Sequence, residues 1–175
     1  MVRRMVAKIA AAERKVVENV AKVISDSFPE AKVSIDKFDK IWVDIPSEKL
    51  VEFAKFVKEK LNCTYITTIT GRDDGKQYIE LLYHMSPEIE GRYVYLTVRI
   101  KVPRDKPEVP TLSNIFPPAE LYEREVYDLL GVKFIGHPNL KRLLLPETLP
   151  EGYHPLRKDF KGPTLEEELS KERKE

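Results

Sequence analysis

The chain has 175 residues, of which 42% are hydrophobic and 34% are charged, with 30 Lys and Arg residues against 29 Asp and Glu residues. The length fits one compact domain with an additional segment, and the apolar content is sufficient for a core, so extensive disorder is excluded. The net charge of +1 excludes strong electrostatic attraction to nucleic acid or to anionic lipid.

Cysteine content and hydropathy restrict the class of protein further. Cys63 is the only cysteine, so the chain cannot form an internal disulfide or supply the roughly four thiolates of an iron–sulfur cluster, and we expect no cofactor. No run approaches the roughly 18 to 20 apolar residues of a membrane span, and the N-terminus has no signal-peptide core. We expect a cytoplasmic protein that reaches a membrane only through partners. Its many Lys, Arg and Glu residues are typical of thermophilic proteins.

The first predicted elements are a helix and a hairpin. Residues 2–28 are expected to form an amphipathic helix that ends near Pro29. Its apolar stripe consists of Met5, Ile9, Val16, Val20 and Val23. Residues 32–36 and 41–45 alternate apolar with polar side chains, which predicts a β-hairpin.

A second helix and three strands are expected next. Pro46 and Ser47 form a helix start signal. The apolar stripe that follows consists of Leu50, Phe53, Ala54, Val57 and Leu61. Strands are predicted over residues 64–70, 77–85 and 92–102, with turn residues at 72–75. This order predicts an α+β fold, in which a mostly antiparallel sheet carries two helices on one face.

The composition changes beyond residue 102, where ten of the 13 prolines lie. Each proline fixes φ and removes a backbone donor, so this part cannot join the sheet as regular strands. One helix is expected between Pro118 and Gly131, because Pro suits early helical positions and Gly suits the position after the end. We expect an α+β domain over 1–110, a helix with an extended Pro-rich arm over 111–164, and a charged tail over 165–175 that is frayed or ordered by a partner.

The Pro-rich arm is rich in large apolar side chains. Leu143, Leu144 and Leu145 are consecutive, and five more large apolar or aromatic residues lie near them. These are Leu140, Leu149, Tyr153, Leu156 and Phe160. If the chain is monomeric, these residues are expected to form an exposed apolar patch, which is typical of an interaction site. The alternative is that the arm folds back and covers its own sheet.

The same segment resembles a known family. Residues 123–130 (EREVYDLL), residues 131–140 (GVKFIGHPNL) and residues 153–160 (YHPLRKDF), with Lys141, Leu143 and Leu144 between them, are similar to the signature blocks of the 30 kDa subunit family of respiratory complex I. The resemblance extends over about residues 110–160. Charged, Gly, Pro and His positions agree together, which makes it far more specific than a short motif.

The resemblance implies a non-catalytic structural subunit without redox groups. Its arm would lie on a large subunit of the nickel–iron hydrogenase type, beside iron–sulfur subunits and, through them, membrane subunits. Similar subunits occur in membrane-bound hydrogenases and sulfur-reducing complexes of anaerobic archaea. The short, unfused chain and its thermophilic composition favour such a complex over a quinone-reducing complex I.

The resemblance also indicates which residues would contact or shape the partner interface. They are Glu123, Arg124, Glu125, Asp128, His137, Pro138, Leu140, Arg142, Leu143, Leu144, Tyr153, His154, Pro155, Arg157 and Phe160. On the helix, the charged residues are expected to gather away from Leu121 and Val126, and Arg124 and Asp128, at i and i+4, can pair with each other or reach a neighbour.

Two other functions remain as alternatives. His137, His154 and Asp128 could serve a small metal-dependent hydrolase, although metal sites generally use three or four clustered ligands. Glu125 and Asp128 would form an acid/base pair only within an apolar cleft. The tyrosines at 83, 93 and 95 could stack RNA bases on a sheet face, but the neutral charge argues against this.

Overall fold

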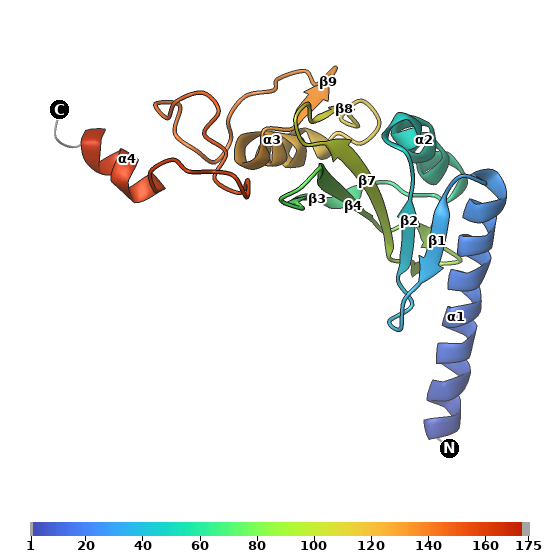
Figure 1. Ribbon diagram of the computed structural model, residues 1–175. Helices are drawn as coiled ribbons and strands as arrows, with labels where there is room; N and C mark the ends of the chain where they lie inside the picture. The colour runs from blue at the N-terminus through green and yellow to red at the C-terminus, as the bar shows by residue number, and fades with distance from the viewer. Residues whose placement is uncertain (1, 173–175) are drawn as a thin grey trace.

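The computed structural model describes the backbone of residues 2–172, with side chains from residue 12 to 167 and at 170, so the predicted stripe positions Met5 and Ile9 lie outside the described side chains. The helices are α1 (Val2–Ser27), α2 (Leu50–Lys60), α3 (Ala119–Leu130) and α4 (Leu165–Glu172), with a 3₁₀ turn at Ser47–Lys49 (Figure 1). The strands are β1 (Lys32–Ile35), β2 (Ile41–Asp44), β3 (Ile66–Asp73), β4 (Tyr78–Met85), β5 (Glu88–Ile89), β6 (Arg92–Tyr93), β7 (Leu96–Pro103), β8 (Glu108–Pro110) and β9 (Lys133–Ile135).

The main sheet has five strands in the order β1-β2-β7-β4-β3. Neighbouring strands are antiparallel except β2 and β7, which are parallel with Val43 opposite Val98. The predicted α+β class and mostly antiparallel sheet are therefore confirmed. The strand order could not be predicted, because β2 pairs with a strand more than 50 residues later.

The two faces of the sheet differ in polarity. Ile41, Leu96 and Met85 lie opposite one another in three adjacent strands and are buried, as are the residues two positions further along each strand. The residues that alternate with the buried ones along each strand, such as Arg99 in β7 and Thr70 in β3, belong to the other face, which is polar and partly exposed. This alternation is the expected pattern for a sheet with one covered face.

The helices cover the apolar face. Phe28, directly after α1, packs its ring edge-on against Phe53 of α2, with centroids 5.0 Å apart. At the β3 edge of the same face, α3 lies over β3 (Figure 1), and a Cβ added to Gly71 would lie 2.3 Å from a terminal methyl of Leu130, which would have to move. Gly71 therefore permits the close approach of α3 to the sheet.

Two predicted details need correction. Val23 is 45% exposed, because the buried stripe of α1 runs through Val20 and Ile24 instead. The expected strand 92–102 is two elements: β6 pairs with β5 around Glu90 and Gly91, which both have positive φ, and β7 begins only at Leu96. Two consecutive positive φ values are typical of a tight hairpin turn.

Two helix ends have specific caps. In the charged tail, residues 165–172 form helix α4, and its first turn has a reciprocal cap. The Thr164 N–H donates to Glu167, and the Glu167 N–H donates to the Thr164 hydroxyl. The expected end of α3 is confirmed, because Gly131 is left-handed with φ 76°. Residues 173–175 of the predicted tail lie outside the described part of the chain.

Candidate partner-binding arm

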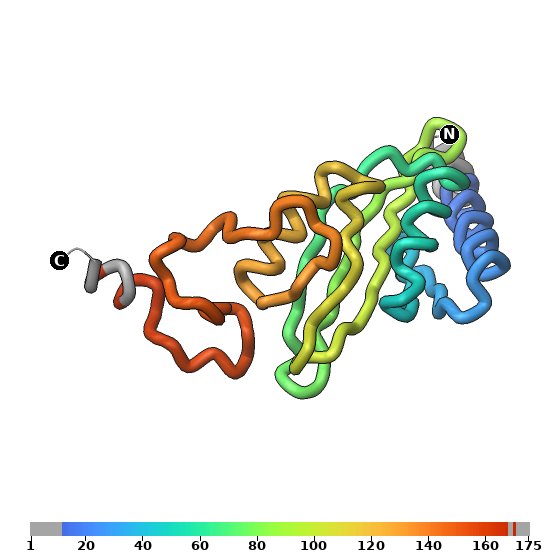
Figure 2. The backbone as a smooth tube through the Cα atoms, turned by 90° about the horizontal axis from the view of Figure 1, so that it is seen from above, coloured from blue at the N-terminus to red at the C-terminus, as the bar shows by residue number. Residues whose placement is uncertain are grey.

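Residues 132–164, called the arm below, extend from the end of α3 away from the sheet and then return toward it (Figure 2). Only its start is in a sheet, where β9 pairs in parallel with β8 through Phe134 and Val109. Within the described chain the rest of its backbone has no strand partner, so other groups must satisfy its buried N–H and C=O groups. Side chains of α3, of the arm itself and of the sheet do so, among them Asp128, Arg142 and Asp73.

Glu123 of α3 anchors the segment that precedes this helix. Its side chain is fully buried and accepts hydrogen bonds from the Leu112 N–H (2.7 Å) and from the Thr111 hydroxyl. Burial disfavours the charged form and raises the pKa of Glu123 to about 7, although both hydrogen bonds favour the anion. Glu123 is thus a buried carboxyl that titrates near neutral pH.

His137 lies beside Glu123 and fixes the beginning of the arm. Its Nε2 donates to the carbonyl of Glu120 (3.0 Å), while Nδ1 accepts the Asn139 N–H (3.0 Å). The hydrogen bond from Asn139 requires an unprotonated Nδ1, which assigns the neutral tautomer with the proton on Nε2. The imidazole is completely buried and ties the arm to the first turn of α3.

Asp128 near the end of α3 holds the leucine run of the arm. Its Oδ2 accepts three consecutive backbone N–H groups, from Leu143 (3.1 Å), Leu144 (2.9 Å) and Leu145 (2.9 Å). The carboxylate is buried, while the side chains of Leu143 and Leu144 are 38% and 58% exposed. The backbone of the run is therefore held internally, and two of its side chains point outward.

Two arginines bind backbone carbonyls of the same stretch. Arg124 donates to the carbonyls of Lys141 (3.1 Å) and Arg142 (2.6 Å). Arg142 donates in turn to the carbonyls of Pro146 (3.2 Å) and Pro150 (2.6 Å). The planar guanidinium suits such paired contacts, so both arginines act as cross-links within the chain.

The returning part of the arm contacts the end of α3. His154 donates from Nδ1 to the carbonyl of Asp128 (2.9 Å), and the Leu156 N–H donates to the carbonyl of Leu129 (3.1 Å). The His154 ring also lies against Gly131, where an added Cβ would be 2.7 Å from it. Gly131 is thus required by both its conformation and this contact.

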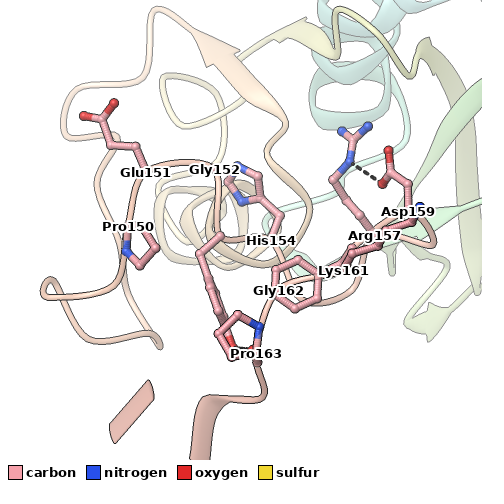
Figure 3. A pocket seen from close by; sticks show the side chains of 11 residues that line it. Pro150, Glu151, Gly152, His154, Arg157, Asp159, Lys161, Gly162 and Pro163 are labelled. Atoms are coloured by element: carbon pink, nitrogen blue, oxygen red, sulfur yellow. Dashed lines mark hydrogen bonds and ion pairs between the residues drawn. The ribbon is translucent and has the colours of Figure 1, made fainter. Parts of the chain in front are cut away.

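A hollow of about 530 Å³ lies within the returning part, and Pro150, His154 and Pro163 are among its lining residues (Figure 3). Tyr153 and Phe160 form its aromatic wall, with ring centroids 4.7 Å apart in an edge-on arrangement. The Tyr153 hydroxyl donates to the carbonyl of Pro163 (2.9 Å), and Tyr153 is only 4% exposed. The hollow is therefore shaped by contacts within the arm.

The buried face of α3 differs from the prediction. Glu123 and Asp128 are buried, whereas Leu121 is 53% exposed, and Arg124 binds carbonyls and does not pair with Asp128. The helical periodicity of α3 predicts that these carboxylates lie on its exposed face, because burying a charge without partners is costly. Here backbone N–H groups of distant segments supply those partners, which no helical pattern reveals.

The remaining predicted interface residues differ in exposure. Glu125 and Pro155 are half-buried, Pro138 is exposed, and Leu140 is partly buried against the core.

Sequence reasoning missed Asp73, which it placed in a turn. A turn-forming Asp gives no signal for long-range contacts, so only the structure reveals its role.

Asp73 is the end of β3, and its side chain is completely buried. It accepts hydrogen bonds from Arg104, from the Gly75 N–H (2.9 Å) and from the Lys158 N–H (2.7 Å). Burial opposes ionisation, but the hydrogen bonds outweigh it and lower the pKa of Asp73 to about 2. This stabilisation is present above the ordinary pKa of 3.8 and is lost as the pH falls toward 2.

The structure does not assemble the hydrolase site. His137 contacts the first turn of α3 and His154 the last, so the two contacts lie about 12 Å apart along the helix axis. Oδ2 of Asp128 is occupied by three backbone N–H groups, and its Oδ1 is buried without a hydrogen-bond partner among the described residues. Among residues whose side chains are described, no group of three or more His, Cys, Asp or Glu residues could hold a metal ion.

The three tyrosines do not share a surface either. Tyr83 is completely buried on the helix-covered face, whereas Tyr93 and Tyr95 are 59% and 61% exposed. The stacking platform considered from sequence is therefore wrong. The inward position of Tyr83 follows from its register opposite Val98, a core residue of β7.

The fold and the arm define a class of protein, an α+β domain with a Pro-rich extension that leaves large apolar side chains exposed. Within residues 2–172 no helix is long and apolar enough to cross a membrane. Residues 43–166 match the family described as the 30 Kd subunit of respiratory-chain NADH dehydrogenase. The chain belongs to this family, as the signature blocks of the arm predicted.

Relatives of the chain are subunits of several respiratory complexes. One NADH-quinone oxidoreductase subunit, from Moorella thermoacetica, is 34% identical over 82% of this chain and 95% of the relative. The beta subunit of the membrane-bound hydrogenase of Pyrococcus furiosus is 34% identical over 83% of this chain and 86% of the relative. A chain in the solved structure of an archaeal membrane-bound sulfane sulfur reductase is 29% identical, with a TM-score of 0.70 over 90% of this chain and 91% of that one.

Proposed function

We propose that the chain is a structural subunit of a membrane-bound respiratory complex and that it binds the large subunit through its arm. The observation that carries this proposal is the combination of a fixed backbone with outward apolar side chains. Leu144 and Leu156 are 58% and 55% exposed although their backbone N–H groups are bound to α3. Exposed apolar side chains on an ordered backbone are typical of a docking surface.

The relatives support a scaffold role. They belong to complexes that differ in redox chemistry, namely a quinone reductase, a hydrogenase and a sulfane sulfur reductase. A protein shared by such different reactions is expected to serve assembly, because the reacting groups would differ from one complex to another. The chain itself would carry no cofactor, and electrons would pass through its neighbours.

The expected partners are a nickel–iron-type large subunit and iron–sulfur subunits, on the cytoplasmic side of the membrane. The domain over residues 1–110 would provide a rigid base, and residues 111–164 would provide the contact. Exposed residues such as Leu143 and Leu144 would touch the partner. Buried ones such as Glu123, Asp128 and Tyr153 would shape the surface from inside.

The test compares two double variants of the tagged full chain, expressed in its native host in place of the normal chain. Leu144→Asp with Leu156→Asp places charges on the arm, and Val23→Asp with Phe38→Asp places charges on exposed apolar positions of the base, 45% and 67% exposed. The measurement is the amount of large and iron–sulfur subunits that co-purify from detergent-solubilised membranes.

We expect the arm variant to lose these subunits and the base variant to retain them. Retention by the arm variant, or by a chain truncated after Lys133, would contradict the proposal. A metal assay of the isolated chain addresses the competing enzyme hypothesis, since stoichiometric metal would support a metal-dependent enzyme.

A further inference from the structure

Three segments that are distant in sequence meet at Asp73. The Gly75 N–H comes from the turn after β3, Arg104 follows β7, and the Lys158 N–H belongs to the arm, 85 positions after Asp73. Arg104 binds both carboxylate oxygens, with Nε at 2.9 Å from Oδ1 and Nη2 at 3.0 Å from Oδ2. Two-point hydrogen bonds between a guanidinium and a carboxylate are among the stronger ones in proteins.

A second layer of contacts surrounds this carboxylate. Arg104 also pairs with Asp159 of the arm (2.8 Å), and Arg157 donates to the carbonyl of Arg104 (3.2 Å). Arg157 and Asp159 pair with each other (3.2 Å; Figure 3). We call the group formed by Asp73, Arg104, Arg157, Asp159 and the Lys158 N–H the latch.

The latch closes the arm into a loop. At its start, the arm is held by the pairing of β9 with β8, and at residue 158 it is held on the sheet by Asp73. The exposed side chains of Leu143, Leu144 and Leu156 lie between these two attachments. Holding both ends reduces the conformations open to the loop, so less entropy remains to be lost when a partner binds.

We propose that Asp73 is a positioning residue for the partner-binding surface, which it keeps as a closed loop before any partner is bound. This inference rests on the proposed function of the arm. It assigns a role to a residue of the sheet that lies outside the family-like blocks and cannot itself touch the partner, because its side chain is completely buried.

Asp44 provides a matched control within the same chain. It forms a similar two-point pair with Arg99, with both distances at 2.6 Å. This pair lies on the open face of the sheet and joins only the neighbouring strands β2 and β7. Asp44→Asn therefore removes the same kind of charge as Asp73→Asn without touching the arm.

The first experiment measures amide hydrogen exchange in the isolated full chain of both variants. In Asp73→Asn we expect the Lys158 amide and its neighbours in residues 141–160 to exchange about tenfold faster or more, because a tenfold change needs the loss of only about 1.4 kcal/mol. Amides of β4 and β7 should keep their exchange rates, and Asp44→Asn should leave the arm unchanged.

Three results would overturn the inference. They are unchanged exchange of the arm in Asp73→Asn, equal acceleration of the arm in Asp44→Asn, and uniform acceleration of the whole chain. Should Asp73→Asn fail to fold, the double variant Arg157→Gln with Asp159→Asn opens the outer contacts while retaining the Asp73–Arg104 pair. It is expected to accelerate exchange in the same residues, and unchanged exchange there would also count against the latch.

The second experiment separates this inference from the proposed function. Wild-type and Asp73→Asn chains, carrying different tags, are co-expressed in the native host and compete for assembly into the complex. We expect the Asp73→Asn chain to be recovered about tenfold less often, because an unfastened arm must be ordered on binding. Equal recovery would overturn the positioning role. The proposed function would still stand if the variant Leu144→Asp with Leu156→Asp loses its partner subunits while its amide hydrogen exchange matches that of the wild type.

Discussion

The base and the arm satisfy the same physical requirement in different ways. In the base, backbone N–H and C=O groups pair along strands, and apolar side chains fill one covered face. In the arm, single side chains replace the ladder, so that Asp128 alone accepts three backbone N–H groups. An irregular, proline-rich segment can thus be ordered without a core of its own, but its order depends on a few polar residues.

This difference predicts that the arm responds most strongly to the loss of one carboxylate. Asp128→Ala leaves three N–H groups without their acceptor and should destabilise the arm by about 2–3 kcal/mol. The measurement is the rate of trypsin cleavage after Lys141 and Arg142, together with thermal unfolding of the whole chain. Cleavage should accelerate strongly, whereas Glu125→Ala, at a half-buried neighbour, should change it little. Equal rates in the two variants would contradict the distinction between base and arm.

The second prediction concerns pH. The pKa of Glu123 rises from 4.5 to about 7 on folding, so its protonated form is favoured in the folded chain. Stability linked to this group is complete below pH 4.5 and is lost as the pH rises toward 7, by about 1–3 kcal/mol. Glu123→Gln should flatten this part of the profile, which chemical denaturation between pH 4.5 and 8 would measure. Glu125→Gln is the control, and an unflattened profile in Glu123→Gln would show that another group titrates.

The smallest effect is expected on the open face of the base. Arg72 pairs with Glu80, but the Arg72 side chain is 68% exposed, and Lys101 lies 3.6 Å from the same carboxylate. Arg72→Gln should therefore cost less than about 1 kcal/mol, because Arg72 is exposed and Lys101 remains beside the buried Glu80 carboxylate. Denaturant unfolding would measure it. A loss as large as that of Asp128→Ala would mean that the base, too, depends on single polar contacts.

Much of the base was predictable because each of its elements has a local pattern. The alternation in β7, with Val98 and Ile100 buried, and the stripe of α2, with Phe53 and Val57 buried, were both expected and are confirmed. The sequence did not reveal the break in the strand between Tyr93 and Leu96. Polar and apolar residues keep alternating there, and only the positive φ values of Glu90 and Gly91 show that a short hairpin precedes β7. Local patterns identify elements more reliably than their boundaries.

For α3 and the arm, the sequence indicated the family and the end of α3 at Gly131, because a glycine at that position and a long specific signature are both local properties. It could not show that Glu123 and Asp128 are buried or that Asp73 meets Lys158. Those contacts join residues up to 85 positions apart, and no periodicity relates them. By itself the sequence determined the elements and the family, whereas the tertiary structure decided which carboxylates are anchors, because a buried charge is stable only where the fold brings donors to it.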